Sequence, residues 1–183
     1  MVTKTGGRPH ISVFIAVSVD GFIARPDGSI DWLSAVEREG EDYGYKVFFD
    51  ACDTLVMGRK TYETVLGFGA WPYANKRCVV LTHRPAKPHH SEEFFDGSVA
   101  DLAAKLGREG ALRLYVDGGQ VIRQFLAAGL IDDLTLSVVP VVLGAGLPLF
   151  GMDGVPAALT LDSTRAYESG LVQLRYRVNS KKY

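Results

Sequence analysis

The chain has 183 residues, 47% of them hydrophobic and 22% charged, which is the composition of an ordinary globular protein. Its 20 basic and 21 acidic residues give a net charge of -1, so composition offers no broad electrostatic reason to bind nucleic acid or an anionic membrane. The longest apolar runs have the length of strands, short of the ~20 residues that a membrane span needs, and the first residues lack the apolar core of a signal peptide.

These values predict a single domain. The length fits one hydrophobic core, so we expect a domain over residues 11–183 that follows a disordered tail over residues 1–10. Cys52 and Cys78 lack CxxC spacing and stand in apolar stretches, which favours buried, reduced thiols and a cytoplasmic location over a disulfide. No metal site is expected, because the histidines lack the spacing of a zinc motif: His10, His83, His89 and His90.

The first predicted strand is a nearly continuous apolar run. Residues 11–19 (ISVFIAVSV) are rich in β-branched side chains, which is typical of a strand buried on both faces in a mostly parallel sheet. Residues 20–33 are rich in Asp, Gly and Pro and are expected to form a loop at the edge of the sheet. Acidic residues followed by apolar residues at helical spacing predict a helix over residues 41–51.

Strands and helices alternate in the middle of the chain. The segments TLVMGRKTYETVL and LRLYVDGGQVIRQFLAAGL each predict a strand, a glycine turn and a helix. Between them, KRCVVLT predicts a further strand, and residues 99–106 predict a helix for which Ser98 is the N-cap. Such alternation is typical of right-handed crossovers between parallel strands.

The C-terminal part predicts strands without intervening helices. The segment DDLTLSVVP precedes a loop rich in glycine and proline, and AALTLDSTRAY and LVQLRYRV are joined by residues 168–170. Two strands with so short a connection form an antiparallel hairpin. We therefore predict an α/β fold with three αβα layers and a mostly parallel sheet that has an antiparallel C-terminal edge.

The strongest chemical signal is a pair of strand-to-helix turns, residues 57–61 (MGRKT) and 117–120 (DGGQ). In each, glycine allows close approach of a ligand, and the following helix start offers unpaired N–H groups, a combination that suits phosphate. Alternatively, each glycine only permits tight packing of a helix on a strand. The pair together with Arg59, Lys60 and Arg84 favours binding, and guanidinium groups at strand exits favour NADPH over NADH. Neither GxGxxG nor a Walker phosphate loop is present.

Five blocks of the chain resemble a known family: ISVFIAVSVDGFIA followed by Trp32, then VMGRKTYE, VVLTHRP, YVDGGQVIRQFL and PVVLGAGLPLF. In this order they resemble dihydrofolate reductases, and especially the riboflavin-pathway pyrimidine reductases that form the C-terminal domain of bacterial bifunctional deaminase-reductases. The resemblance extends from Ile11 to about Val178. It implies a dihydrofolate-reductase-like fold, NADPH as the cofactor and a homodimer.

The same resemblance implies a set of cofactor-binding residues. Ala16 and Ile23 would border the nicotinamide ring. The phosphates, the adenosine end and the nicotinamide ribose would be held by three further groups: Gly58, Arg59, Lys60 and Thr61; Leu81, Thr82, His83 and Arg84; and Gly118, Gly119 and Gln120. Asp117 departs from the small residue that usually precedes Gly-Gly in dihydrofolate reductases, and orienting the turn is one role open to it.

The substrate side is defined by fewer motifs. The resemblance implies that Ser18, Asp20 and Gly21 face the substrate, with Asp20 or a water as a proton donor, although an Asp-Gly turn without a ligand is an alternative. Asp42 matches the helix carboxylate of dihydrofolate reductases at an ungapped offset, but an acid at a helix start is also an ordinary partner of the helix dipole. Trp32 is either a lid over a flat heterocycle or a plug over the core.

These observations predict an NADPH-dependent reductase that transfers a hydride to a pyrimidine- or pterin-type substrate, similar to 5-amino-6-(5-phosphoribosylamino)uracil reductase. Two alternatives stay open. One is a dihydrofolate reductase, although the arginine that clamps the folate tail has no clear counterpart here. The other is a nucleotide-binding module without catalysis. A small heterocycle and a second copy of the chain are the expected partners.

Overall fold

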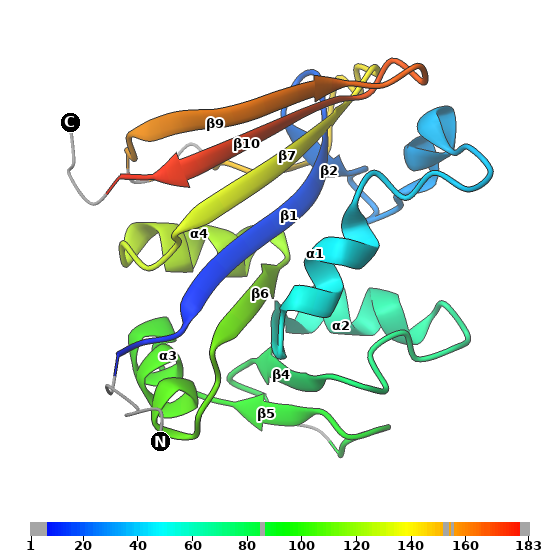
Figure 1. The fold of residues 1–183 in the computed structure, drawn as a ribbon. Coiled ribbons are helices and arrows are strands. Elements are labelled where there is room, and N and C mark those ends of the chain that lie inside the picture. Colours follow the sequence, from blue (N-terminus) through cyan, green and yellow to red (C-terminus); the bar gives the residue numbers. More distant parts are fainter. Residues whose placement is uncertain (1–6, 85–86, 152–153, 155, 180–183) are drawn as a thin grey trace.

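A single eight-stranded sheet forms the centre of the computed structural model, which describes residues 7–84, 87–151, 154 and 156–179 (Figure 1). The strand order is β5-β4-β3-β6-β1-β7-β10-β9. All neighbours from β5 to β7 are parallel, whereas β10 runs antiparallel to both β7 and β9. The strands are β1 (His10–Ser18), β3 (Thr54–Gly58), β4 (Arg77–Leu81), β5 (Glu93–Phe95), β6 (Arg113–Asp117), β7 (Asp133–Val139), β9 (Leu159–Ala166) and β10 (Val172–Val178).

Helices cover both faces of the sheet and bury separate hydrophobic clusters. In Figure 1, α1 lies in front of the sheet, and α3 and α4 lie behind it. The rear cluster joins α3 and α4 to β1 and β6, while Tyr62 and Val65 of α2 share the other cluster with side chains of α1. These two layers of helices around one sheet confirm the predicted three-layer α/β fold. The helices are α1 (Tyr45–Ala51), α2 (Arg59–Leu66), α3 (Val99–Arg108) and α4 (Gly119–Ala127).

Local signals in the sequence are confirmed at two places. The Ser98 side chain accepts a hydrogen bond from the Asp101 backbone N–H at 3.1 Å and caps α3 as predicted. The C-terminal strands β9 and β10 form the predicted antiparallel hairpin, which is closed by a hydrogen bond from the Tyr167 N–H to the Leu171 carbonyl at 2.9 Å. The N-cap and the hairpin both depend on residues close together in the chain, and for this reason the sequence predicts them.

The first helix begins later than residue 41, where the sequence predicts its start. Tyr43 and Gly44 adopt left-handed backbone conformations, with φ angles of 56° and 79°, so a right-handed helix starts only at Tyr45. The Asp42 carboxylate accepts hydrogen bonds at 2.9 Å from the backbone N–H groups of Gly44 and Lys46. The expected helical turn over residues 41–44 is therefore replaced by a cap.

The loop expected over residues 20–33 contains short regular elements. The strand β2 (Phe22–Ala24) pairs with β8 (Leu147–Pro148), and the 3-10 helix η1 (Asp31–Val36) follows it. The sequence did not predict β2, because this strand is defined by pairing with the two-residue strand β8 far along the chain. This small second sheet positions residues 23–45 beside the carboxyl ends of the main strands.

The N-terminal boundary differs slightly from the expected one at residue 11. Residues 1–6 of the expected tail lie outside the described part of the chain. Within the remainder, Arg8 forms an ion pair with Asp132 at 2.7 Å, and His10 already belongs to β1. Cys52 and Cys78 are both buried and free, as the sequence predicts. None of the described helices is long and apolar enough to cross a membrane.

Candidate active site

A cleft with a volume of about 2330 Å³ opens at the carboxyl ends of the parallel strands. Its floor is formed by the ends of β1, β3, β4, β6 and β7, and residues 23–45 form a wall on one side. In open α/β sheets, ligands collect where strands end and helices begin. The cleft therefore coincides with the position that the two glycine turns predict.

The two glycine turns lie against each other in this cleft. A Cβ atom added to Gly118 would lie 2.4 Å from Thr61 Oγ1, and one added to Gly58 would lie 3.0 Å from Val121 Cγ2. Among the described residues, no side chain caps the N-terminus of either α2 or α4, so the first N–H groups of both helices are left for another partner. Two adjacent helix N-termini form an environment that favours a negatively charged group.

The glycines also have clear packing roles. Gly118 has a φ of 89°, a conformation that side chains rarely adopt. A Cβ atom on Gly119 would lie 2.8 Å from Ile23 Cδ1 and 3.3 Å from the Pro148 carbonyl oxygen. Close packing of the turn against β2 and β8 therefore requires glycine whether or not a ligand is bound.

Basic side chains lie along the same edge. The Arg59 guanidinium pairs with Glu63 at 2.7 Å and donates to the Arg84 carbonyl oxygen, which fixes the loop after β4 against α2. Within the described part of the chain, neither Lys60 nor Arg84 takes part in an ion pair, and both line the cleft. An anion bound at the two turns would thus meet two cations that have no competing carboxylate partner among those residues.

All of the cofactor-binding residues implied by the resemblance lie in this cleft. His83 pairs with Asp96 at 2.6 Å on the exposed rim, and the Thr82 hydroxyl accepts a hydrogen bond from the Arg84 N–H at 3.1 Å. The full set that lines the cleft is Ala16, Ile23, Gly58, Arg59, Lys60, Thr61, Leu81, Thr82, His83, Arg84, Gly118, Gly119 and Gln120.

Asp117, at the end of β6, has the most unusual electrostatic environment in the cleft. Its carboxylate accepts a hydrogen bond from the Gly118 N–H at 2.8 Å, but burial dominates and raises its pKa to about 6. Tyr45, Tyr73 and Tyr115 line the cleft near it; burial and then the charge of Asp117 raise the pKa of Tyr45 to about 12, and they also raise those of Tyr73 and Tyr115. A carboxyl group with a pKa near neutrality can serve as a general acid.

The structure does not bring Ser18, Asp20 or Gly21 to the cleft. Asp20 instead accepts hydrogen bonds from the Ser18 hydroxyl at 2.7 Å and from the backbone N–H groups of Leu143 and Gly144 at 3.1 and 2.7 Å. The hydrogen bond from Ser18, followed by those from the backbone, lowers the pKa of Asp20. An ionised carboxylate that holds a loop has no proton to donate near neutral pH, so we assign Asp20 no catalytic role.

Trp32 and Asp42 also have structural roles. Trp32 is 5% exposed and packs behind the cleft wall with Val36, Val139 and Leu171, so it is a plug and not a lid. Asp42 lines the rim, but the N–H groups of Lys46 and Gly44 lower its pKa and occupy its carboxylate as a helix cap. The carboxylate that a dihydrofolate reductase needs in its pocket is therefore engaged elsewhere.

The sequence did not predict an acidic group with a raised pKa at Asp117. The feature that could have indicated it is a charged residue between a buried strand and Gly-Gly, where a small residue is usual in dihydrofolate reductases. Tyr45 and Tyr73 were not expected either, because they approach Asp117 from segments far away in the chain.

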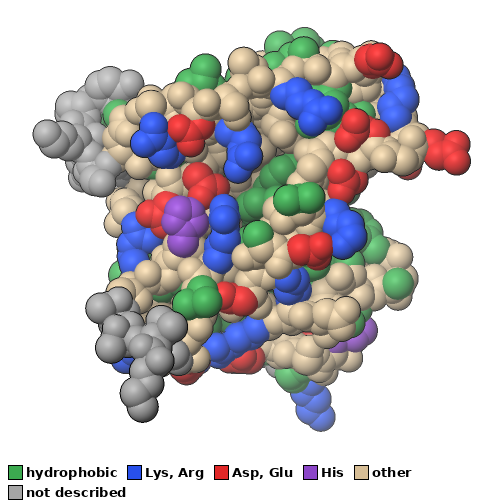
Figure 2. Space-filling view, in the orientation of Figure 1, with side chains coloured by type: hydrophobic (Ala, Val, Ile, Leu, Met, Phe, Trp, Pro, Cys, Tyr) green, Lys and Arg blue, Asp and Glu red, His purple; other side chains and the backbone are tan. Residues whose placement is uncertain are grey.

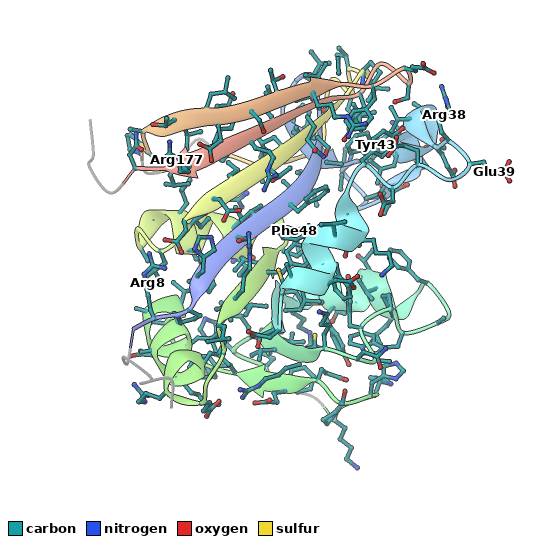
Figure 3. All side chains as sticks on the ribbon, viewed as in Figure 1. Arg8, Arg38, Glu39, Tyr43, Phe48 and Arg177 are labelled. Atoms are coloured by element: carbon teal, nitrogen blue, oxygen red, sulfur yellow. The ribbon has the colours of Figure 1, made fainter. Side chains whose placement is uncertain are left out.

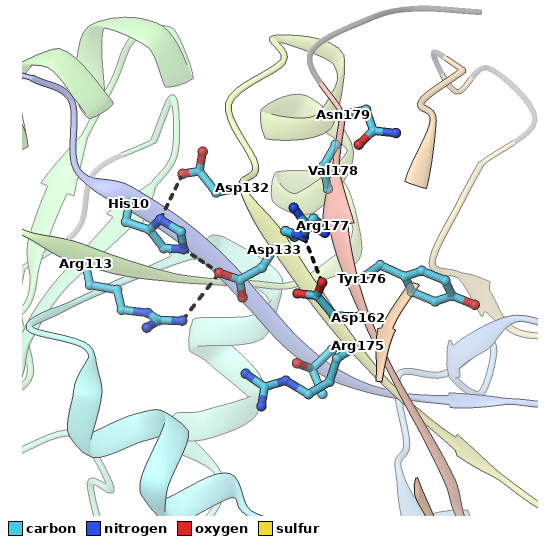
Figure 4. A pocket seen from close by; sticks show the side chains of 11 residues that line it. His10, Arg113, Asp132, Asp133, Asp162, Arg175, Tyr176, Arg177, Val178 and Asn179 are labelled. Carbon is cyan, nitrogen blue, oxygen red and sulfur yellow. Dashed lines mark hydrogen bonds and ion pairs between the residues drawn. The ribbon is translucent and has the colours of Figure 1, made fainter. Parts of the chain in front are cut away.

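A second, smaller pocket of about 490 Å³ lies at the opposite end of the sheet, at the amino ends of β1, β6 and β7. Most of its charged side chains pair with one another: His10 contacts Asp132 and Asp133, and Arg113 also pairs with Asp133 (Figure 4). Such mutual pairing leaves little charge for a ligand. The cleft remains the candidate active site.

The chain is similar to proteins of known family and structure. Residues 9–173 match the family model for the RibD C-terminal domain, and the chain belongs to this family. Its structure is similar to that of a putative riboflavin biosynthesis protein from Shewanella sp. PV-4, with 34% sequence identity, a TM-score of 0.87, and coverage of 93% of this chain and 99% of that one.

Two more distant structures share the fold. One is a diaminohydroxyphosphoribosylaminopyrimidine deaminase/5-amino-6-(5-phosphoribosylamino)uracil reductase from Thermotoga maritima, with 16% identity, a TM-score of 0.71, and coverage of 94% of this chain and 57% of that one. The other is a dihydrofolate reductase from Enterococcus faecalis in complex with NADP(H), with 19% identity, a TM-score of 0.67, and coverage of 93% and 96%. The chain thus has the dihydrofolate-reductase-like fold.

Proposed function

We propose that the protein is an NADPH-dependent reductase that transfers a hydride to a pyrimidine- or pterin-type heterocycle. The observation that carries this proposal is the cleft, where two helix N-termini without a described side-chain cap and two cations without a described ion pair lie beside a carboxyl group with a raised pKa. Membership of the RibD C-terminal domain family supports the reductase class. The similar fold of a dihydrofolate reductase in complex with NADP(H) supports the cofactor.

The residues of the cleft fit a nicotinamide dinucleotide along the sheet edge. Arg84 and Lys60 would bind phosphate groups, and the N–H groups at the starts of α2 and α4 would receive the pyrophosphate. Ala16 and Ile23 offer apolar contacts at the end of β1 and on β2. A volume of about 2330 Å³ leaves room for a second flat ring. When bound, the cofactor supplies a hydride.

The chain itself supplies orientation and a proton. Walls that hold two rings in contact provide proximity, which is worth roughly 7 to 11 kcal/mol. Reduction of a C=N bond also needs a proton on nitrogen, and the Asp117 carboxyl group can donate it because burial keeps part of the population protonated near pH 6. No covalent nucleophile is required. Water can return the proton to Asp117 after each turnover.

The proposed cofactor is tested with Arg84→Ala. We expect Arg84 to bind the 2'-phosphate of NADPH, which NADH lacks. Loss of a charge-assisted contact costs about 1.5 to 3 kcal/mol, so the variant should bind NADPH at least tenfold more weakly, whereas its affinity for NADH should be almost unchanged. Arg108→Ala, which removes an arginine outside the cleft, is the matched control. Titration of cofactor fluorescence at fixed ionic strength gives both affinities. Equal losses for the two cofactors, or no binding of NADPH to the unaltered protein, would refute the assignment.

A turnover assay separates an enzyme from a binding module without catalysis. A reductase consumes NADPH in the presence of a substrate, whereas a binding module changes the cofactor fluorescence without oxidising it. Dihydrofolate is the substrate that distinguishes the other enzyme class. Because Asp42 is engaged as a helix cap, we expect dihydrofolate to be turned over poorly.

We also propose a homodimer that uses the C-terminal hairpin. All eight residues of the edge strand β9 are exposed, and Leu159 and Leu161 are 37% and 51% accessible. A long edge strand with apolar side chains is normally protected against uncontrolled pairing, and a second copy of the chain would cover it. Light scattering at several concentrations tests this proposal, and a mass near 19.9 kDa throughout would contradict it.

We propose that the protein is cytoplasmic. Its two cysteines are buried and unpaired, which is the usual state of thiols in a reducing compartment. Fractionation of cells that express the chain, followed by immunoblotting, tests this location.

A further inference from the structure

The two walls of the cleft carry charges of opposite sign. Arg59, Lys60, Arg84 and Arg123 line it on the side of the strand-to-helix turns, where Glu63 also lines it and pairs with Arg59 at 2.7 Å, so this side keeps an excess of positive charge. The facing wall, residues 23–45, contributes no lysine or arginine to the lining formed by the described residues. It contributes acidic side chains instead: Asp27, Asp31, Glu37, Glu41 and Asp42. In Figure 2, acidic and basic side chains alternate at the upper right, over the part of the molecule that contains η1.

The order of the strands indicates that the basic wall contacts the dinucleotide and the acidic wall contacts the substrate. The basic turns follow β4, β3 and β6, which are consecutive in the sheet, and β1 and β7 come next. A dinucleotide that spans the basic turns ends at β1, so the remaining space lies between β1, β7 and residues 23–45. This assignment rests on the proposed function. The acidic wall then faces the substrate.

The acidic wall is fixed to the body of the protein. The Tyr43 backbone carbonyl accepts a hydrogen bond from Gln173 of β10 at 3.0 Å, and its hydroxyl hydrogen bonds to Ser169 at 2.9 Å. In Figure 3, Tyr43 lies where the segment before α1 meets the C-terminal hairpin. A wall held in this way cannot easily withdraw its carboxylates from the cleft.

Only part of this negative charge is compensated. Arg25 pairs with Asp31 at 2.6 and 3.2 Å, and the Glu41 carboxylate accepts a hydrogen bond from the Tyr43 N–H at 2.7 Å. Hydrogen bonds to neutral donors stabilise a carboxylate without cancelling its charge. Among the described residues, Asp27, Glu37 and Glu41 take part in no ion pair. The potential at this wall is therefore negative.

We propose that the substrate of this protein is a pyrimidine- or pterin-type ring that carries no phosphate or carboxylate group. A phosphate normally binds to guanidinium groups, ammonium groups or free N–H groups at a helix start, and those that line the described cleft lie on the opposite side. Carboxylates facing an anionic substrate would repel it. The chain thereby differs from a reductase of 5-amino-6-(5-phosphoribosylamino)uracil, the activity named for the Thermotoga maritima protein.

Two probes that differ only in the phosphate test this proposal: 5-amino-6-(ribosylamino)uracil and its 5'-phosphate. We expect kcat/KM with NADPH to be on the order of tenfold higher for the compound without phosphate. Added salt should raise kcat/KM for the phosphorylated compound, because screening weakens repulsion more than it weakens contacts that do not involve charge. If this wall instead bound the phosphate group, added salt would lower kcat/KM for the phosphorylated compound.

A variant of the wall identifies the cause. Asp27→Asn/Glu37→Gln/Glu41→Gln keeps the shapes and one acceptor oxygen on each side chain but removes three charges, so it should reduce the preference for the compound without phosphate at least threefold. Glu39→Gln is the matched control, because Glu39 belongs to the same segment but does not line the cleft (Figure 3). The Glu39→Gln variant should prefer the compound without phosphate as strongly as the unaltered protein does. An unchanged preference in the triple variant would contradict the electrostatic cause.

The possible failures are distinct. If NADPH binds and the phosphorylated compound is turned over equally well or better, the proposal is wrong while the reductase assignment stands. If NADPH binds and neither compound is turned over, a pyrimidine substrate is ruled out. If NADPH does not bind, the proposed function itself fails, and the substrate assignment fails with it.

Discussion

The turns Asp20-Gly21 and Asp117-Gly118 have the same residues, and both lie at the end of a strand of the central sheet. Their glycines have the same φ of 89°. Asp20 lies outside the cleft and accepts hydrogen bonds from one side chain and two backbone N–H groups, which lower its pKa. Asp117 lies within the cleft and accepts a hydrogen bond from the Gly118 N–H, but burial raises its pKa to about 6.

Local sequence therefore does not decide whether an aspartate stabilises a loop or holds a proton. The number of N–H donors and the degree of burial decide it, since donors favour the charged form and burial disfavours it. We therefore expect the two turns to respond differently to the same substitutions.

The largest difference should appear in catalysis. Asp117→Asn keeps the size of the side chain and an acceptor for the Gly118 N–H, but it removes the acid, so kcat should fall about 100-fold or more. The affinity for NADPH should change little. In the unaltered protein, kcat should decline as pH rises through about 6, and the residual rate of the variant should be nearly independent of pH. Asp20→Asn is the control, and a similar loss in it would remove the distinction between the turns.

The second difference concerns stability and pH. The pKa of Asp117 is about 6 in the folded protein, whereas the ordinary value for an aspartate, which we take for the unfolded chain, is 3.8. The folded protein therefore holds this proton more tightly. The resulting stabilisation is present below pH ~4 and is lost as pH rises through about 6; it amounts to about 3 kcal/mol. Urea unfolding at several pH values should show that the stability of the unaltered protein relative to Asp117→Asn declines over this range. Parallel curves would contradict the raised pKa.

The two glycines allow a matched test of packing. Alanine costs about 1–2 kcal/mol at either position because of the positive φ. At Gly21 no described atom lies within 4 Å of the added Cβ, whereas at Gly118 the added Cβ would lie 2.4 Å from Thr61 Oγ1. Gly118→Ala should therefore destabilise the protein by about 3 kcal/mol in total.

Thr61→Ala provides the corresponding rescue. In the Thr61→Ala background, the additional effect of Gly118→Ala should decrease to the level of Gly21→Ala, because the overlapping hydroxyl is gone. Thermal unfolding of the single and double variants measures this coupling. Equal effects of the two single glycine substitutions would show that the contact with Thr61 contributes nothing.

The smallest effect is expected for Asp20→Asn. The amide oxygen can still accept hydrogen bonds from the Ser18 hydroxyl and the Leu143 N–H, but the NH2 group that replaces the second oxygen cannot accept one from the Gly144 N–H. The melting temperature should fall slightly, and the loss should shrink as pH is lowered and the native carboxyl group becomes protonated. Calorimetry at two pH values measures both the decrease in melting temperature and its change with pH. A loss that grows at low pH would contradict this role.

Much of the fold was predictable because its signals are local. Apolar runs followed by glycine and a helical pattern identified the turns after β3 and β6, and Ser98 identified the start of α3. The start of α1 was not predictable in this way. The left-handed Tyr43 before it is held by Ser169 and Gln173, which lie more than a hundred residues further along the chain.

The site was predictable to a similar extent. Glycines and basic residues at strand ends predicted the edge of the sheet at which the cleft opens, since parallel strands bring their carboxyl ends to one edge. The pKa shifts of Asp20 and Asp117 were not predictable, because Leu143 and Gly144 bind Asp20 from a distant loop, and Asp117 becomes buried only when the chain folds. Their protonation states are properties of the folded chain.

The most direct test of the central claim is a crystal structure of the protein with NADPH. We predict that the pyrophosphate lies within hydrogen-bond distance of backbone N–H groups at the starts of both α2 and α4, with the nicotinamide beside Ala16 and within reach of Asp117. NADPH bound away from these two turns, or with its nicotinamide remote from Asp117, would contradict the proposed active site.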